Sequence, residues 1–216
     1  MQVRTWRAEV VGSLLRPPEL VGARKRLESG ELTQAEFKAV EDAAIRQAIE
    51  LQKGAGIDVV TDGEFRRYAF YGHLIDAFEG FDREGGWAIP FRDEHGEQLI
   101  LKRPVVVNRL RWKRSMCGEE WTFLRSMGKG PGKVTMLSAQ QAAAYYDPEK
   151  SKDAYPTRDA YLADIVDLSR REVEELIRLG CTYIQIDAPQ YGALLDPTIR
   201  EGYRQRGSDP LSLIHI

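Results

Sequence analysis

The chain has 216 residues, 43% of them hydrophobic and 30% charged, which is an ordinary composition for a globular protein of one large or two small domains. Its formal net charge of −2 gives no general attraction to nucleic acids or anionic membranes, and the sequence has neither a signal-peptide pattern nor a run of ~20 apolar residues. Because the two cysteines have no short spacing, we expect a reduced, cytoplasmic protein.

The first predicted strand covers residues 9–12 and ends at Ser13. The first long helix begins after Thr33, since Thr33 and Glu36 have the spacing of a capping box, in which each side chain bonds the backbone amide of the other residue. Apolar residues then recur at helical spacing, and we expect Gly54 to end the helix in the left-handed conformation.

A short, β-branched strand is predicted at residues 57–61, and it leads into Glu64. The same order returns later in the chain: an amphipathic helix from Asp159, a glycine, a buried strand at residues 182–186 and then Asp187. Helices that alternate with short apolar strands are typical of a parallel sheet covered by helices. In such folds the chemistry lies at the carboxyl ends of the strands, where both acids stand.

Another strand fits residues 133–137, which end at Ser138, and residues 126–132 read as a loop. Between residues 80 and 114 the pattern changes, because residues 99–101 and 105–107 favour either a hairpin or a strand with a bent entry, which we interpret as an insertion or an excursion at the barrel edge. About four strands can be counted, whereas a (β/α)8 barrel needs eight and typically ~250 residues. The chain is therefore either a smaller open sheet or about half of a barrel.

Glu64 and Asp187 at one rim suit a cationic group such as a substrate ammonium, or an acid/base pair; alternatively they only cap the following helices. The amides and hydroxyl of Gly12-Ser13 could bind a carboxylate or phosphate. Arg66 and Arg67 could steer an anion, but we expect them to be exposed loop arginines.

Other candidates are weaker. The glycines at 128, 130 and 132 lack dinucleotide-binding spacing, and the basic stretch at 109–114 does not favour nucleic-acid binding at this net charge. His73 and His95 have no metal partner at useful spacing. Cys181 opens a buried strand and is expected in the core.

Four stretches, taken together and in order, resemble the cobalamin-independent methionine synthase family, specifically its catalytic C-terminal barrel and its short stand-alone relatives. They are Val11-Gly12-Ser13, residues 59–67 (VVTDGEFRR), residues 133–137 (KVTML) and residues 184–189 (IQIDAP). The resemblance implies a (β/α)8 TIM-type barrel of which this chain holds about the first half. We assign residues 1–210 to the N-terminal portion of this single domain, and expect residues 211–216 (LSLIHI) to be a non-native tail.

In that family a glycine-serine loop holds the carboxylate of a thiol amino acid such as homocysteine, and two acids hold its ammonium. Carried over residue by residue, the resemblance implies substrate binding by Val11 and Ser13 at the carboxylate and by Glu64 and Asp187 at the ammonium. It thereby gives Asp187 a role at the end of its strand.

The resemblance also implies a zinc-dependent S-methyltransferase of the 5-methyltetrahydropteroyltriglutamate–homocysteine type, acting in methionine biosynthesis, with zinc binding the thiol as a thiolate. The family's zinc ligands begin with a His-x-Cys motif that would lie beyond the end of this chain. We therefore assign no catalytic and no metal-binding residue here, and we expect the truncated chain to be inactive.

The folate side departs from the family pattern. The large synthases have a tryptophan where Ala139 stands, an acid at the place of Ala193, and an arginine-cysteine pair near residues 99–100. The alternatives are therefore a related thiol alkyltransferase with a non-folate donor, or a non-catalytic amino acid-binding barrel.

Overall fold

The computed structural model describes residues 8–86, 88–92, 98–128, 130–193 and 195–205, so His95 and the expected tail at residues 211–216 lie outside the described residues. The helices are α1 (Pro18–Glu28), α2 (Gln34–Gly54), α3 (Gly72–Ala77), α4 (Gly118–Ser126), α5 (Ala139–Ala142), the 3₁₀ turn η1 (Ala143–Tyr145), α6 (Arg158–Arg178), α7 (Gln190–Ala193) and α8 (Pro197–Gln205). The strands are β1 (Phe78–Asp82), β2 (Ala88–Arg92), β3 (Gln98–Lys102), β4 (Val105–Trp112), β5 (Val134–Leu137) and β6 (Ile184–Asp187).

Helix α2 begins where the capping box places it. The Thr33 hydroxyl accepts from the Glu36 amide at 3.2 Å, and the Thr33 amide donates to the Glu36 carboxylate at 2.8 Å. The helix ends at Gly54 as expected, but Gly54 does not take the left-handed conformation; Gly56, with φ of 75°, takes it two residues later. Gly180, with φ of 82°, ends the segment after α6 as predicted.

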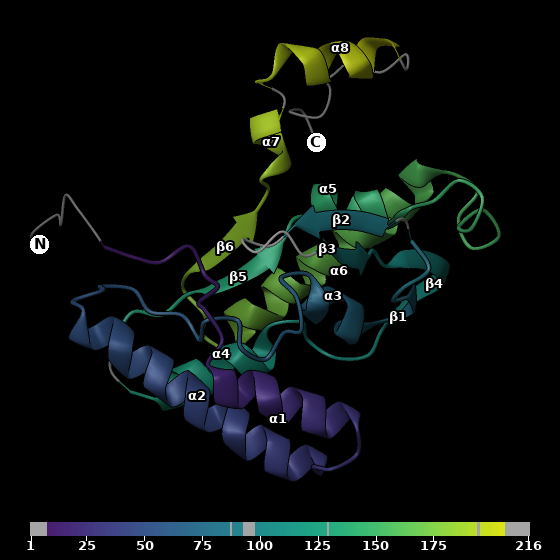
Figure 1. Ribbon diagram of the computed structural model, residues 1–216. Helices are drawn as coiled ribbons and strands as arrows, with labels where there is room; N and C mark the ends of the chain where they lie inside the picture. The colour runs from purple at the N-terminus through teal and green to yellow at the C-terminus, as the bar shows by residue number, and fades with distance from the viewer. Residues whose placement is uncertain (1–7, 87, 93–97, 129, 194, 206–216) are drawn as a thin grey trace, which may run out of the picture.

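Four chain segments run parallel and in sequence order, and the last two of them, β5 and β6, are strands that lie side by side (Figure 1). Strands β5 and β6 pair in parallel from Val134 opposite Ile184 to Leu137 opposite Asp187. One parallel bridge joins Glu9 to Val59, and a second parallel bridge joins Val60 to Gly132. The strands expected at 9–12 and 57–61 are thus reduced to bridges, but their order is that of the first four strands of a (β/α) barrel.

The excursion between residues 78 and 112 is arranged differently from the expected hairpin. Strands β3 and β4 do not pair with each other: β3 pairs antiparallel with β2, and β4 pairs antiparallel with β1. The result is two separate two-stranded sheets. A register shift between Glu79 and Phe81 allows Gly80, at φ of 111°, to approach the backbone oxygen of Asn108 where a Cβ would have no room.

The core lies between the parallel strands and the helices that cover them. Helix α2 buries Phe37, Ile45 and Ile49, and helix α6 buries Ile165 and Leu176 on the spacing that its sequence predicted. Helices α1 and α2 lie side by side, whereas α7 and α8 extend away from the body after β6 (Figure 1). In the described part of the chain, no helix combines the length and apolar character needed to cross a membrane.

Candidate substrate-binding site

The turn that carries Glu64 is held in an unusual backbone conformation. Gly63 and Glu64 have φ of 73° and 59°, and among the described residues Glu64 is the one non-glycine with positive φ. For such a residue this conformation costs roughly 1 kcal/mol or more, so it needs support. Support comes from Asp62 Oδ1, which accepts from the Glu64 amide at 2.8 Å, and from Thr61 Oγ1, which accepts from the Gly63 amide at 3.1 Å.

The turn directs the Glu64 side chain against β5. The carboxylate is only 5% exposed, and its Oε1 accepts from the Thr135 hydroxyl at 2.6 Å. The next helix, α3, begins at Gly72, so the alternative that Glu64 caps the following helix is wrong. A carboxylate held this firmly at the end of a parallel strand is a preformed acceptor for a positive group.

The Gly12-Ser13 loop packs directly on this carboxylate. A Cβ on Gly12 would lie 2.7 Å from Glu64 Oε1 and 2.7 Å from Thr135 Cγ2, so only glycine fits without displacing the acid. The Thr61 hydroxyl donates to the Gly12 carbonyl at 2.8 Å, and the Leu14 amide donates to the Gly63 carbonyl at 3.0 Å. The two loops that the sequence singled out are therefore bound to each other.

Asp187 and Val11 are joined through Gln185, which sequence reasoning missed. The Gln185 amide nitrogen donates to Asp187 Oδ1 at 2.6 Å and to the Val11 carbonyl at 2.9 Å. The Val11 side chain is 79% exposed and Ser13 is also exposed, so Val11 takes part through its backbone. The signal was a single amide in an apolar strand, two residues before Asp187 and on the same face.

Arg66 and Arg67 are not exposed, contrary to expectation. The Arg67 side chain is 2% exposed and donates to the Glu120 carboxylate of α4 at 2.7 and 2.6 Å. Arg66 is 7% exposed and binds Glu41 and Asp42 of α2 at 2.8 and 2.7 Å. Both arginines therefore tie the Glu64 turn to surrounding helices.

Burial shifts the pKa of several groups near the turn. Burial, followed by the charge of Glu120, raises the pKa of Asp62 to about 7, and its Oδ2 has no partner in the structure. Burial also lowers the pKa of His73 well below its usual value and raises that of the Cys117 thiol well above its own. His73 is thus neutral and Cys117 is an unreactive thiol near neutral pH. Cys181 is buried as expected.

The described residues do not fit a zinc site. In the described ranges no three histidine, cysteine, aspartate or glutamate side chains gather closely enough to hold a metal ion. Both cysteines are buried protonated thiols with main-chain oxygens beside them, which is not the chemistry of a zinc thiolate. No step of a reaction is therefore derived through a metal.

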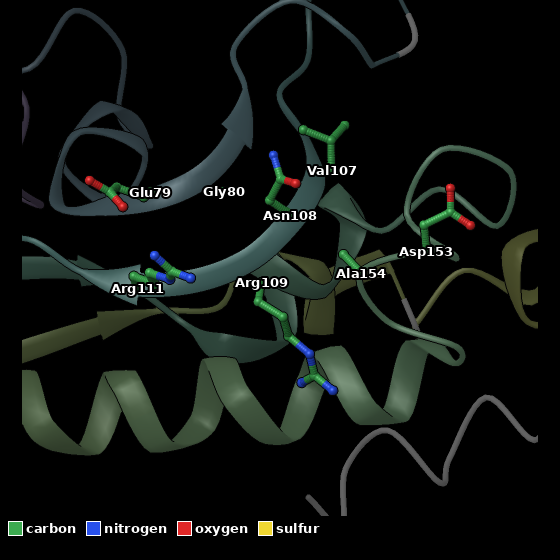
Figure 2. A pocket seen from close by; sticks show the side chains of 8 residues that line it. All are labelled: Glu79, Gly80, Val107, Asn108, Arg109, Arg111, Asp153 and Ala154. Carbon is green, nitrogen blue, oxygen red and sulfur yellow. The ribbon is translucent and has the colours of Figure 1, made fainter.

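A cavity of about 530 Å³ opens along the β1–β4 sheet, away from the rim (Figure 2). Glu79, Arg111 and Arg109 line it, and Arg109 already pairs with Asp164 at 3.0 Å and lies over the ring of Tyr155. None of the four predicted binding residues lines this cavity. We place the candidate site at the strand ends instead, because Glu64 contacts Gly12 there and Asp187 is linked to Val11 through Gln185.

The parallel strand order and the acids at the carboxyl ends define a part of a (β/α) barrel with a rim site. The family model for the catalytic domain of cobalamin-independent synthases matches residues 6–213, and the chain belongs to this family. The resemblance inferred from the sequence is confirmed.

Individual relatives agree with this assignment. The chain is 28% identical to the uncharacterized protein YxjH of Bacillus subtilis, over 96% of this chain and 54% of that protein. It is 27% identical to a 5-methyltetrahydropteroyltriglutamate–homocysteine methyltransferase of Trichodesmium erythraeum, over 89% of this chain and 24% of that protein. The chain thus spans about half the length of the short relatives and a quarter of the long synthase.

Solved structures confirm the fold class. A B12-independent methionine synthase from Shewanella in complex with selenomethionine superposes with a TM-score of 0.64 at 24% identity, covering 85% of this chain and 51% of that one. A putative vitamin-B12 independent methionine synthase from Listeria monocytogenes gives 0.69 at 22% identity, covering 95% of this chain and 60% of that one. The chain therefore has the fold of a part of the barrel type expected from the sequence.

Proposed function

We propose that this chain supplies the amino acid-binding half of a thiol methyltransferase of the methionine synthase type. The acceptor would be homocysteine or a similar thiol amino acid, and methyl transfer to its sulfur would form methionine or its analogue. Family membership supports the reaction class, and the Shewanella relative was solved with selenomethionine, the selenium analogue of the methionine that we propose as the product.

The observation that carries the proposal is the contact between the Glu64 carboxylate and Gly12. It brings an acid for an ammonium beside a loop whose amides and hydroxyl suit a carboxylate, and a free amino acid presents both groups on one carbon. Asp187, linked to Val11 through Gln185, adds the second acid. These residues bind and orient the substrate.

We assign no step of methyl transfer to the described residues. The zinc ion and the methyl donor belong to the proposal for the whole protein and rest on the family alone, because the described side chains offer no ligand set. The second candidate function is a thiol alkyltransferase with a non-folate donor, because Ala139 stands where the large synthases carry a tryptophan. An amino acid-binding barrel without catalysis is the third.

Calorimetric titration with L-homocysteine tests the proposal. We expect Glu64→Gln and Asp187→Asn each to weaken binding by about tenfold or more, because each removes one charge from the ammonium site. Glu174→Gln, on the exposed side of α6, is the matched control and should bind as the wild type does. Unchanged affinity in both site variants, with native circular dichroism, would overturn the site assignment.

A further inference from the structure

Arg67 poses a problem for an ammonium site at Glu64. Its Nη1 lies 3.4 Å from Glu64 Oε1, and its guanidinium is almost fully buried. A free arginine at this distance would compete with a substrate ammonium for the carboxylate and would repel the incoming positive charge. Something must direct Arg67 elsewhere if Glu64 is to bind a cation.

Glu120 of α4 directs the Arg67 guanidinium away from Glu64 by binding it. It is 4% exposed, and its two oxygens accept from Arg67 Nε at 2.7 Å and from Nη2 at 2.6 Å, in the bidentate arrangement that arginine and carboxylates prefer. Nη2 also donates to the Thr135 carbonyl at 2.6 Å. The short hydrogen bonds of Arg67 thus go to Glu120 and Thr135, whereas its contacts with Glu64 at 3.4 Å and with the Cys117 sulfur at 3.9 Å are longer.

The local charges support the same reading. Burial lowers the pKa of Arg67, but Glu120, followed by Cys117 and Glu64, together outweigh burial and raise this pKa well above its usual value, so the arginine stays positive. Glu120 balances that charge and leaves the charge of Glu64 for a ligand. Arg16, the other nearby cation, donates to the main-chain oxygens of Glu64 and Arg67.

We propose that Glu120 is a positioning residue for the ammonium site: by binding Arg67 on both oxygens it limits this arginine to one long contact with the Glu64 carboxylate. The inference rests on the proposed amino acid-binding function and adds a residue that touches no substrate. It also sets specificity, since only ligands with an amino group gain from a negatively charged Glu64. The Asp62 carboxyl, which adjoins Arg67 and Glu120, adds to the same negative field when ionised.

The test compares L-homocysteine with 4-mercaptobutanoate, which is homocysteine without its amino group, in calorimetric titrations of the protein. For Glu120→Gln we expect homocysteine affinity to fall about tenfold while 4-mercaptobutanoate stays within about twofold of wild type. The matched control is Glu119→Gln, the next residue on α4, whose half-exposed carboxylate pairs with Lys38 and which should change neither affinity. A general structural defect would weaken both ligands equally.

A second variant covers the case that Glu120→Gln does not fold, since it leaves Arg67 buried and unbalanced. The double variant R67Q/E120Q removes both charges, and we expect it to bind homocysteine within about threefold of wild type, because nothing then competes for Glu64. A folded E120Q variant with wild-type affinity for homocysteine overturns the inference, as does an R67Q/E120Q variant that no longer prefers homocysteine over 4-mercaptobutanoate. Wild-type protein that binds no homocysteine, or E64Q that binds it normally, instead overturns the proposed function.

Discussion

At the scale of single residues, Asp62 is a buried group whose charge state the fold controls. Its pKa of about 7 lies far above the value of about 4 expected in an unfolded chain, because burial and Glu120 disfavour the anion. The folded protein therefore binds a proton at Asp62 more tightly than the unfolded chain does. The stability that this proton contributes is fully present below pH 4 and is lost as the pH rises through 7.

Between pH 5 and pH 7, we expect the free energy of unfolding of the wild type to fall by about 2 kcal/mol relative to that of Asp62→Asn. The reason is that asparagine does not titrate, while it keeps the acceptor for the Glu64 amide. Urea unfolding of both proteins at these two pH values measures the change. The comparison cancels His73, whose lowered pKa works in the opposite direction and is present in both proteins. A difference between variant and wild type that does not change with pH would contradict the expectation.

Sequence reasoning singled out Glu64 and Asp187 because each stands at the end of a short apolar strand or within three residues of it, which is a local signal. It missed Glu120 and placed Arg67 on the surface, because the partner of Arg67 stands 53 residues further along the chain and on a helix. No local pattern distinguishes a buried arginine from an exposed one when its partner comes from tertiary structure. The two proposed binding acids thus have a local sequence signal, whereas the residue that holds Arg67 has none.

At the scale of secondary-structure elements, helix α4 has its N-terminus capped by another helix. Its N-cap residue, Cys117, makes no capping bond of its own. Glu172 of α6, fully buried, accepts from the amides of Met116 and Cys117 at 2.9 and 2.8 Å and from the Ser115 hydroxyl at 2.8 Å. A negative charge at this end also suits the helix dipole, so one side chain both caps α4 and fixes α6 against it.

We expect Glu172→Gln to lower the free energy of unfolding by about 2–3 kcal/mol, because the new NH₂ group faces donors and leaves at least one buried amide unpaired. Urea denaturation measures the loss, and Glu174→Gln, two residues away on the exposed side of α6, should change it by less than about 0.5 kcal/mol. If both variants unfold at the same urea concentration, the cap is not supplied by Glu172.

The elements that sequence patterns predicted well are the ones with local signals. Helix α2 has its capping box and α6 its apolar spacing and terminal glycine, and both begin within one residue of the expected start. The hairpin expected between residues 99–101 and 105–107 was wrong, because strand pairing depends on contacts between residues that are distant in the sequence. The strand expected at residues 99–101 pairs backward with β2, and that expected at 105–107 pairs with the more distant β1.

At the scale of the whole molecule, three of the four parallel segments are tied together on one face by a buried lysine. The Lys133 side chain is 1% exposed, and its Nζ donates to Glu9 at 3.1 Å and to Gln185 at 2.7 Å. Because Gln185 also holds Val11 and Asp187, this polar layer connects the strand order to the rim site. Apolar patterning placed the strands but gave no sign of this layer.

Strand β6 is the end of this parallel series, and in the described residues it pairs with β5 alone. All four residues of β5 are buried and the segment just before it bridges to Val60 at Gly132, whereas Ile186 of β6 is 55% exposed. An unpaired strand edge is open to water and to other strands.

We expect the amides of the 216-residue chain to exchange with D₂O at least about tenfold faster in β6 than in β5, as measured by mass spectrometry of peptic fragments. Equal protection of the two strands would contradict this expectation and would mean that a further strand covers β6. The same measurement on mixtures with another chain or on a longer protein would then identify the source of that strand.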